Sequence, residues 1–172
     1  DHRDLHSFPT RRSSDLVGGI AGTSFYTKRH FKEDIVTGPN VTEVFKLSRY
    51  NPNLEGTIGD SDVYVLKGEK EGGSLVVLGS THANEPSGHM AGIILEENAK
   101  VEAGTIYVIP NINNSALTHN DPLDGSPQYM HFTTKNGETR TFQYGSRATN
   151  PIDQWPDPDI YTHKSSGQTL SG

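Results

Sequence analysis

His82 and Glu85 are the two residues of this chain whose types and spacing best suit catalysis. They lie three positions apart in the stretch THANEP, which follows the apolar run Leu75–Leu78. An imidazole and a carboxylate that converge on one side of a turn form a catalytic zinc site when a further histidine and a water join them. The spacing by itself is weak evidence, because 8 histidines and 10 glutamates in 172 residues predict about half a match by chance.

The surroundings of this pair are more informative than its spacing. Leu75–Leu78 is a short run with β-branched residues between glycines, which predicts a strand buried on both faces. Pro86 is typical of the first turn of a helix, and we expect the helix to continue to Ala99. The residues expected on one face of that helix are Met90, Ile93, Ile94 and Glu97. His82 and Glu85 would then lie at the carboxyl edge of a sheet, where open α/β sheets bind ligands.

His30 and Glu33 form a second pair with the same spacing. No buried strand precedes them, and their neighbours are polar. We therefore interpret His30 and Glu33 as solvated surface residues.

The stretch LVVLGSTHANEPSG resembles the zinc-binding turn of the succinylglutamate desuccinylase/aspartoacylase family, zinc hydrolases related to the metallocarboxypeptidases. The resemblance covers roughly Val63–Gly172 and is most specific around residues 75–90 and 106–122. It implies that His82 and Glu85 are two ligands of Zn²⁺ in an incomplete metallocarboxypeptidase-like αβα domain. The implied activity is hydrolysis of the amide bond of an N-acyl amino acid or a similar small substrate.

The resemblance also implies that part of the site lies elsewhere. The family takes its third zinc ligand, a histidine, and its catalytic glutamate from later strands, and no matching motif occurs before Gly172. We therefore expect no catalytic residue in this chain and no activity from it alone. The family's pocket is lined by a loop that corresponds to Asn111–Pro122, and the wall residues so implied are Asn111, Asn113 and Asn114. The family also holds a substrate carboxylate with an arginine, and the resemblance implies that Arg147 has this role, which suits a guanidinium because it can pair with a carboxylate in bidentate fashion.

Other interpretations stay open. His82 and Glu85 could be a surface histidine and a helix-capping carboxylate, and Arg147 could form a loop salt bridge. The same turn would suit a metallocarboxypeptidase acting on peptides, or a non-catalytic binding domain that kept the fold. His89, one helical turn after Glu85, is expected on the helix surface rather than on a metal. The histidines expected at solvent or at the pocket rim are His119, His131 and His163.

The remaining patterns predict an α/β fold with a mixed sheet. Asp62–Lys67 alternates like a strand, and the glycine-rich turn after it leads into Ser74–Leu78 as an antiparallel pair. The helix from Pro86 leads on to the apolar strand Thr105–Ile109, which gives a βαβ unit with parallel strands. Asn40 is expected to cap a short helix that ends near Pro52. The residues on one face of that helix would be Val41, Val44, Phe45 and Ser48.

The C-terminal third combines a hairpin with a tail. Tyr129–Tyr144 predicts a β-hairpin inserted beside the pocket, and its Asn136-Gly137 pair is typical of a type I′ turn. From Gly145 onward no periodicity remains, and the prolines of Trp155–Pro158 favour an extended chain. We expect this tail to lack its packing partners.

Composition excludes several functions. The net charge is −6 with no basic cluster, which argues against a nucleic-acid partner. The chain has no cysteine, so disulfides and thiolate metal sites are excluded. No run of 18 apolar residues occurs, and no membrane partner is expected within the chain. The expected partner is a small N-acyl amino acid or a short peptide.

The N-terminal residues do not resemble the rest. Asp1–Leu16 is similar, residue for residue, to the in-frame translation of a sequencing adapter, and we expect it to be disordered and to make no contact with the core. Residues 17–39 are expected to be a lead-in, in which Val17–Tyr26 is either flexible or the stub of a truncated signal or anchor segment. Residues 40–172 would form the N-terminal part of one zinc-hydrolase domain, and the compartment stays open.

Overall fold

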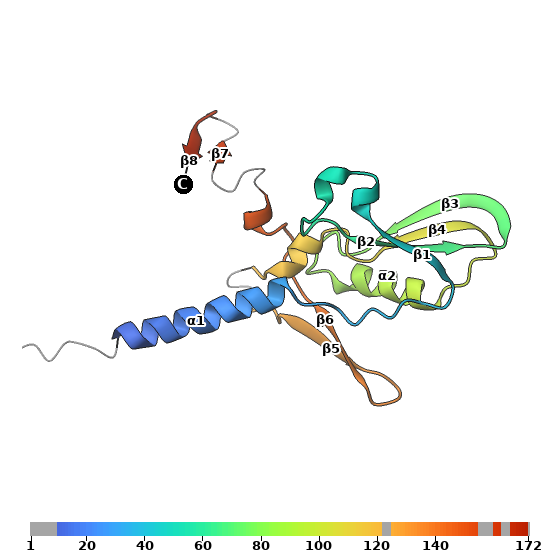
Figure 1. Ribbon diagram of the computed structural model, residues 1–172. Helices are drawn as coiled ribbons and strands as arrows, with labels where there is room; N and C mark the ends of the chain where they lie inside the picture. Colours follow the sequence, from blue (N-terminus) through green and yellow to red (C-terminus); the bar gives the residue numbers. More distant parts are fainter. Residues whose placement is uncertain (1–9, 122–124, 155–159, 163–165, 172) are drawn as a thin grey trace, which may run out of the picture.

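A four-stranded mixed sheet forms the centre of the computed structural model, which describes residues 10–121, 125–154, 160–162 and 166–171 (Figure 1). The strands are β1 (Val41–Lys46), β2 (Asp62–Lys67), β3 (Lys70–Leu78) and β4 (Ala103–Ile109), in the order β1-β2-β4-β3. The pairs β1–β2 and β2–β4 are antiparallel, whereas β3 and β4 are parallel. The predicted α/β class with a mixed sheet is therefore confirmed.

The inner strand β2 is covered on both faces because its alternate side chains enter two different core clusters. Val63 and Val65 pack with Phe45 and Ile109 on one face. Tyr64, Leu66 and Val108 form the cluster on the other face. The helix α2 (Pro86–Asn98) runs along this second face and connects β3 to β4, so the predicted βαβ unit is present (Figure 1).

The buried side of α2 differs from the predicted one. Its buried residues are His89, Gly92, Ile93 and Glu96. Ile94, expected to face inward, is 57% exposed. A Cβ on Gly92 would lie 3.2 Å from Pro110 Cα, so the helix approaches the end of β4 through a residue without a side chain. Of the residues expected on one face, Ile93 is buried, whereas the buried face as a whole is rotated toward His89 and Glu96.

The predicted helix at residues 40–52 is wrong. Val41–Lys46 is the edge strand β1, which pairs along β2 from Val41↔Leu66 to Lys46↔Asp62. The β-branched and aromatic residues of this segment suit a strand, and pairing with β2 outweighs their helix-like spacing. Short 3₁₀ turns at Leu47–Arg49 and Pro52–Leu54 follow the strand.

Two predictions about β3 are also wrong. It does not pair with β2, because β4 lies between them. It is not buried on both faces either, since it forms the sheet edge and leaves Val76 58% and Leu78 52% exposed. A run of apolar residues does not by itself distinguish a central strand from an edge strand.

The predicted hairpin is present as β5 (Tyr129–Thr133) and β6 (Thr139–Gln143). Its turn is not type I′, which needs positive φ at both central residues. Gly137 has φ 85° but Asn136 does not have positive φ, and Gly137 N–H donates to the Thr134 carbonyl at 3.0 Å. The hairpin was expected beside a pocket, but it also contributes to the protein interior, because the side chain of Phe142 is only 1% exposed.

The N-terminal residues contain a helix rather than a flexible lead-in. α1 (Thr10–Arg29) includes residues 10–16, for which no structure was expected, and it projects from the rest of the protein (Figure 1). Towards the other end of the chain lie 3₁₀ turns at Asn114–Thr118 and Pro151–Asp153 and a small pair of strands, β7 (Ile160–Thr162) and β8 (Thr169–Ser171). The expectations for residues 1–9, Trp155–Pro158 and His163 fall outside the described residues.

Candidate metal centre

The turn after β3 is shaped by close backbone contacts. Gly79 N–H donates to the Ile109 carbonyl at 2.9 Å, and a Cβ on Gly79 would lie 2.5 Å from the Pro110 carbonyl oxygen. Ser80 follows with φ 52°, a left-handed conformation that is uncommon outside glycine, and its side chain is buried. Such strain is held in place by the surrounding structure and is frequent at functional sites.

His82 and Glu85 face each other within this turn. Nδ1 of His82 lies 3.1 Å from Oε1 of Glu85, and the Glu85 N–H donates to the His82 carbonyl at 3.0 Å. Two ligand atoms on one tetrahedral zinc ion lie about 3.3 Å apart, as follows from metal–ligand distances of about 2.0–2.1 Å. The His82 side chain is 33% and the Glu85 side chain 57% exposed, so both are open to solvent. The two side chains thus form a direct hydrogen bond or ion pair, and their separation is close to that of two ligand atoms on one metal ion.

Arg147 lies beside the same carboxylate. Its Nη1 is 3.4 Å from Oε1 of Glu85, and its side chain is 67% exposed. Backbone hydrogen bonds explain the placement, since Ala83 N–H donates to the Ser146 carbonyl and Gly145 N–H to the Ala83 carbonyl, both at 3.0 Å. The residues 83 and 145–146 thus hold the turn and Arg147 in one surface site, although 62 positions separate Glu85 from Arg147.

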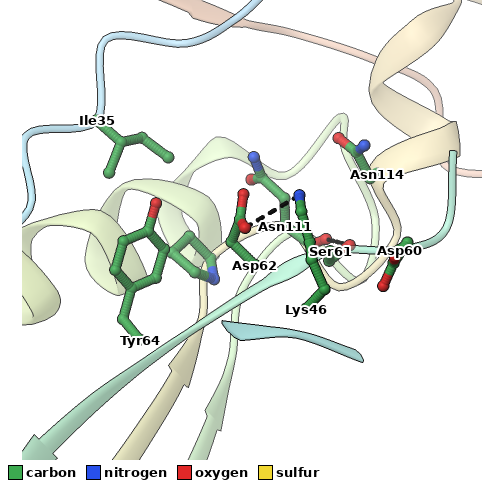
Figure 2. A pocket seen from close by; sticks show the side chains of 9 residues that line it. Ile35, Lys46, Asp60, Ser61, Asp62, Tyr64, Asn111 and Asn114 are labelled. Atoms are coloured by element: carbon green, nitrogen blue, oxygen red, sulfur yellow. Dashed lines mark hydrogen bonds and ion pairs between the residues drawn. The ribbon is translucent and has the colours of Figure 1, made fainter. Parts of the chain in front are cut away.

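The three asparagines of the following loop do not act as one wall. Asn113 contacts the turn, because its Nδ2 donates to the Thr81 carbonyl at 3.3 Å. Asn111 and Asn114 instead line a cavity of about 60 Å³, where Lys46 pairs with Asp62 at 3.0 Å (Figure 2).

This cavity is separate from the metal turn. Tyr64 and Ile35 border it on the side away from Asp60, and it shares lining residues with a wider hollow of about 610 Å³ next to His30 and Phe31 (Figure 2). Neither lining includes His82, Glu85 or Arg147. Asn111 and Asn114 therefore line this separate cavity and do not form the expected wall beside the candidate metal ligands.

His89 and Glu33 form a buried pair that the sequence did not reveal. Nε2 of His89 lies 3.0 Å from Oε1 of Glu33, and their side chains are 2% and 4% exposed. The predictions of a surface His89 and a solvated Glu33 are therefore wrong. His30, the other member of the second pair, is exposed.

The other predicted histidines lie apart from the turn. His119 is partly buried, and burial lowers the pKa of its imidazole. His131 is exposed on the hairpin, where its Nδ1 lies 3.0 Å from Thr141 Oγ1. His163 lies outside the described residues.

Within the described ranges, no three side chains of His, Cys, Asp or Glu are grouped so that they could hold a metal ion. The turn at His82 thus brings together one imidazole, one carboxylate and one neighbouring guanidinium. The chain matches no protein-family model, and no curated protein or solved structure is similar enough to count as a match. The interpretation of the turn therefore depends on its own geometry and on the sequence resemblance.

Proposed function

We propose that this chain is part of a zinc-dependent hydrolase that cleaves the amide bond of an N-acyl amino acid, with a succinylglutamate desuccinylase/aspartoacylase-like, metallocarboxypeptidase-like fold. The observation that carries the proposal is the separation of 3.1 Å between His82 Nδ1 and Glu85 Oε1 in the turn after β3. In this proposal His82 and Glu85 are zinc ligands, and the third ligand and general base come from residues outside the described ranges.

The donor atoms present suit this role. Histidine nitrogen and glutamate oxygen are both ligands of catalytic zinc, and such sites have three protein ligands and one open position. When bound, zinc would supply a Lewis acid that polarises the scissile carbonyl and lowers the pKa of water. Glu85 and His82 would hold the ion at the solvent-facing end of β3, where a substrate can approach.

Arg147 would determine which amides bind. Its side chain is 67% exposed, and its guanidinium has spare N–H donors beyond the one directed to Glu85. A substrate carboxylate could pair with this planar group while the amide carbonyl lies over the metal ligands. Arg147 thus orients the substrate and would favour acids over neutral amides.

The test uses the chain continued through the residues that follow Gly172. Hydrolysis of N-succinyl and N-acetyl amino acids is measured with and without zinc, beside peptides with a free C-terminus. The proposal expects zinc-dependent release of the amino acid, which His82→Ala and Glu85→Ala abolish. His131→Ala is the matched control, because it removes an exposed imidazole away from the turn.

The outcomes separate the candidate functions. Cleavage of peptides alone would identify a carboxypeptidase instead of a deacylase. Substrate binding without turnover, unaffected by zinc, would identify a non-catalytic binding domain. Activity retained in both ligand variants would contradict a metal site at this turn.

A further inference from the structure

The cavity of about 60 Å³ beside Tyr64 contains polar atoms that have no hydrogen-bond partner in the protein. Tyr64 is 8% exposed, and its hydroxyl forms no hydrogen bond with any residue that the structure describes. Figure 2 shows this hydroxyl directed between Ile35 and Asn111. A buried polar group without a protein partner is costly unless a water or a ligand bonds to it. The cavity therefore favours an occupant that forms hydrogen bonds.

The amide of Asn111 offers this occupant an acceptor. Its Nδ2 donates to Glu33 Oε2 at 2.7 Å, which fixes the NH2 group on the carboxylate. Its Oδ1 is buried and has no partner. An amide oxygen only accepts hydrogen bonds, and a phenol oxygen can accept as well as donate. An occupant that satisfies Asn111 therefore carries a hydrogen-bond donor.

The charged side chains around the cavity are more acidic than basic. Of the described residues that line it, Asp60 and Asp62 are acidic and Lys46 alone is basic. Asp60 Oδ1 accepts a hydrogen bond from the Ser48 N–H at 2.8 Å, and Asp62 Oδ1 pairs with Lys46 Nζ at 3.0 Å. The second oxygen of each carboxylate has no partner among the described residues. The charge of the lining thus favours a cation.

The hydroxyl of Tyr64 lies in the same negative field. The pKa of this phenol is raised from 10 to about 12, first by burial and then by nearby carboxylates. The carboxylates that contribute are Asp62, Glu96, Glu33 and Glu97. A field that disfavours a phenolate at this point of the cavity stabilises a positive charge at the same point.

The apolar part of the lining favours an organic cation over a metal ion. Ile35, Pro110 and the ring of Tyr64 border the cavity. Phe31 and Ile58 line the wider hollow of about 610 Å³ that shares its lining residues. A carbon chain can pack on such side chains, and an ammonium group is attracted to an aromatic ring. Among the described residues no three side chains of His, Cys, Asp or Glu are grouped so that they could hold a metal ion.

We propose that the cavity binds the ammonium group of a small primary amine. The three N–H donors of an ammonium match three acceptors on the lining, namely the second oxygen of Asp62, Asn111 Oδ1 and Tyr64 Oη. About 10–15 Å³ of cavity volume holds one water, so 60 Å³ accepts an ammonium group and its first carbon atoms. The rest of the carbon chain extends into the wider hollow. Because the cavity is separate from the turn at His82, the proposal does not depend on the proposed hydrolase.

Lys46 competes with such a ligand in the unaltered protein. Its Nζ pairs with Asp62, and the two side chains are 52% and 45% exposed. An exposed ion pair of this kind is weak, so an amine can take the place of Lys46 at the carboxylate. Removal of the lysine should therefore strengthen the binding of an amine, whereas it would weaken the binding of an anion.

The test compares butylamine with butyrate and butanol, which have the same number of carbon atoms, by isothermal titration of the unaltered chain. We expect saturable binding of butylammonium, at least about tenfold tighter than that of either analogue. Lys46→Met should tighten the binding at least about threefold. Tyr64→Phe should weaken it at least about fivefold, and it removes no hydrogen bond of the fold because this hydroxyl has no partner among the described residues.

Two exposed residues supply matched controls. Tyr50→Phe removes a hydroxyl from a side chain that is 73% exposed and does not line the cavity. Lys67→Met removes an exposed lysine from the opposite end of β2 to Asp62. Neither change should alter the affinity for butylammonium.

The possible outcomes decide the proposal. Tighter binding of butyrate than of butylammonium, or weaker amine binding in Lys46→Met, would overturn it and indicate an anion site. Absence of amine binding, or equal affinities of the unaltered chain and Tyr64→Phe, would overturn it as well. The comparison of the three probes uses the unaltered chain, so it stays decisive even where a variant unfolds.

Discussion

The carboxylate of Glu33 lies 3.0 Å from His89 Nε2 in the protein interior, and it joins its own segment to three others that are distant in sequence. Its Oε2 accepts a hydrogen bond from Asn111 Nδ2 at 2.7 Å, and its Oε1 also accepts one from the Gln143 N–H at 2.8 Å. The segment before β1, helix α2, the loop after β4 and strand β6 therefore meet at one carboxylate.

Glu33→Gln should destabilise the fold. In the variant, an NH2 group takes the place of one carboxylate oxygen. This group would face an N–H donor of Asn111, His89 or Gln143, so at least one buried donor would lose its acceptor. Loss of a buried charged hydrogen-bond partner costs about 2–4 kcal/mol. Urea unfolding followed by circular dichroism would measure the change in the free energy of unfolding.

Glu138→Gln is the control for that experiment. Glu138 is exposed in the turn between β5 and β6, and its replacement should change the free energy of unfolding by less than about 0.5 kcal/mol. Equal stabilities for Glu33→Gln and the unaltered protein would show that the buried carboxylate does not hold these segments together.

Glu96 gives the fold a specific pH dependence. Its side chain is fully buried in α2, and burial raises the pKa of its carboxyl from 4.5 to about 7. The folded state thus binds this proton more tightly than the unfolded state. The stabilisation is complete below about pH 4.5 and is lost as the pH rises through 7.

Glu96→Gln should remove that dependence. An amide can still accept the hydrogen bond from the Gly38 N–H, and it has no charge to desolvate. Above pH 8 we expect the variant to be more stable than the unaltered protein by on the order of 2–3 kcal/mol, and near pH 4.5 about equally stable. Thermal melting between pH 4.5 and 8.5 would test this, and parallel stability curves would contradict it.

Arg147→Ala should change specificity more than turnover. In the proposed hydrolase we expect kcat/KM for carboxylate-bearing substrates to fall roughly 50-fold, the loss of about one charge-assisted bidentate pair. For neutral analogues of the same amides it should change less than about threefold. Similar losses for both substrate classes would instead indicate that Arg147 acts by holding Glu85.

The elements that sequence predicted correctly are those whose signals are local. β2, β4, α2 and the hairpin follow from patterns within each segment, and the strand–turn–helix context brings His82 and Glu85 together. The same reasoning could not show that β4 separates β2 from β3, because strand order depends on pairing between distant segments.

The buried polar residues show the same limit. Glu33 and His89 belong to polar or helical stretches that look solvent-exposed, and their burial depends on partners about 20 to 110 positions away. Among the sequence signals, only the family resemblance relates Arg147 to the site. Its actual position depends on the backbone bonds between Ala83 and residues 145–146. No periodicity within a segment reports such contacts.

The last prediction concerns zinc binding by this chain without further residues. In the proposed site His82 and Glu85 supply two ligands, whereas a catalytic ion is held by three protein ligands, so we expect this chain to be nearly free of zinc after dialysis. The histidine nearest in sequence cannot complete the set in this conformation, because His89 is buried against Glu33. Metal analysis of the unaltered chain, His82→Ala and the extended protein would measure occupancy, with about one zinc expected only in the extended protein. Stoichiometric zinc in the short chain, lost in His82→Ala, would mean that the third ligand is local and that the fold around Glu33 and His89 rearranges to provide it.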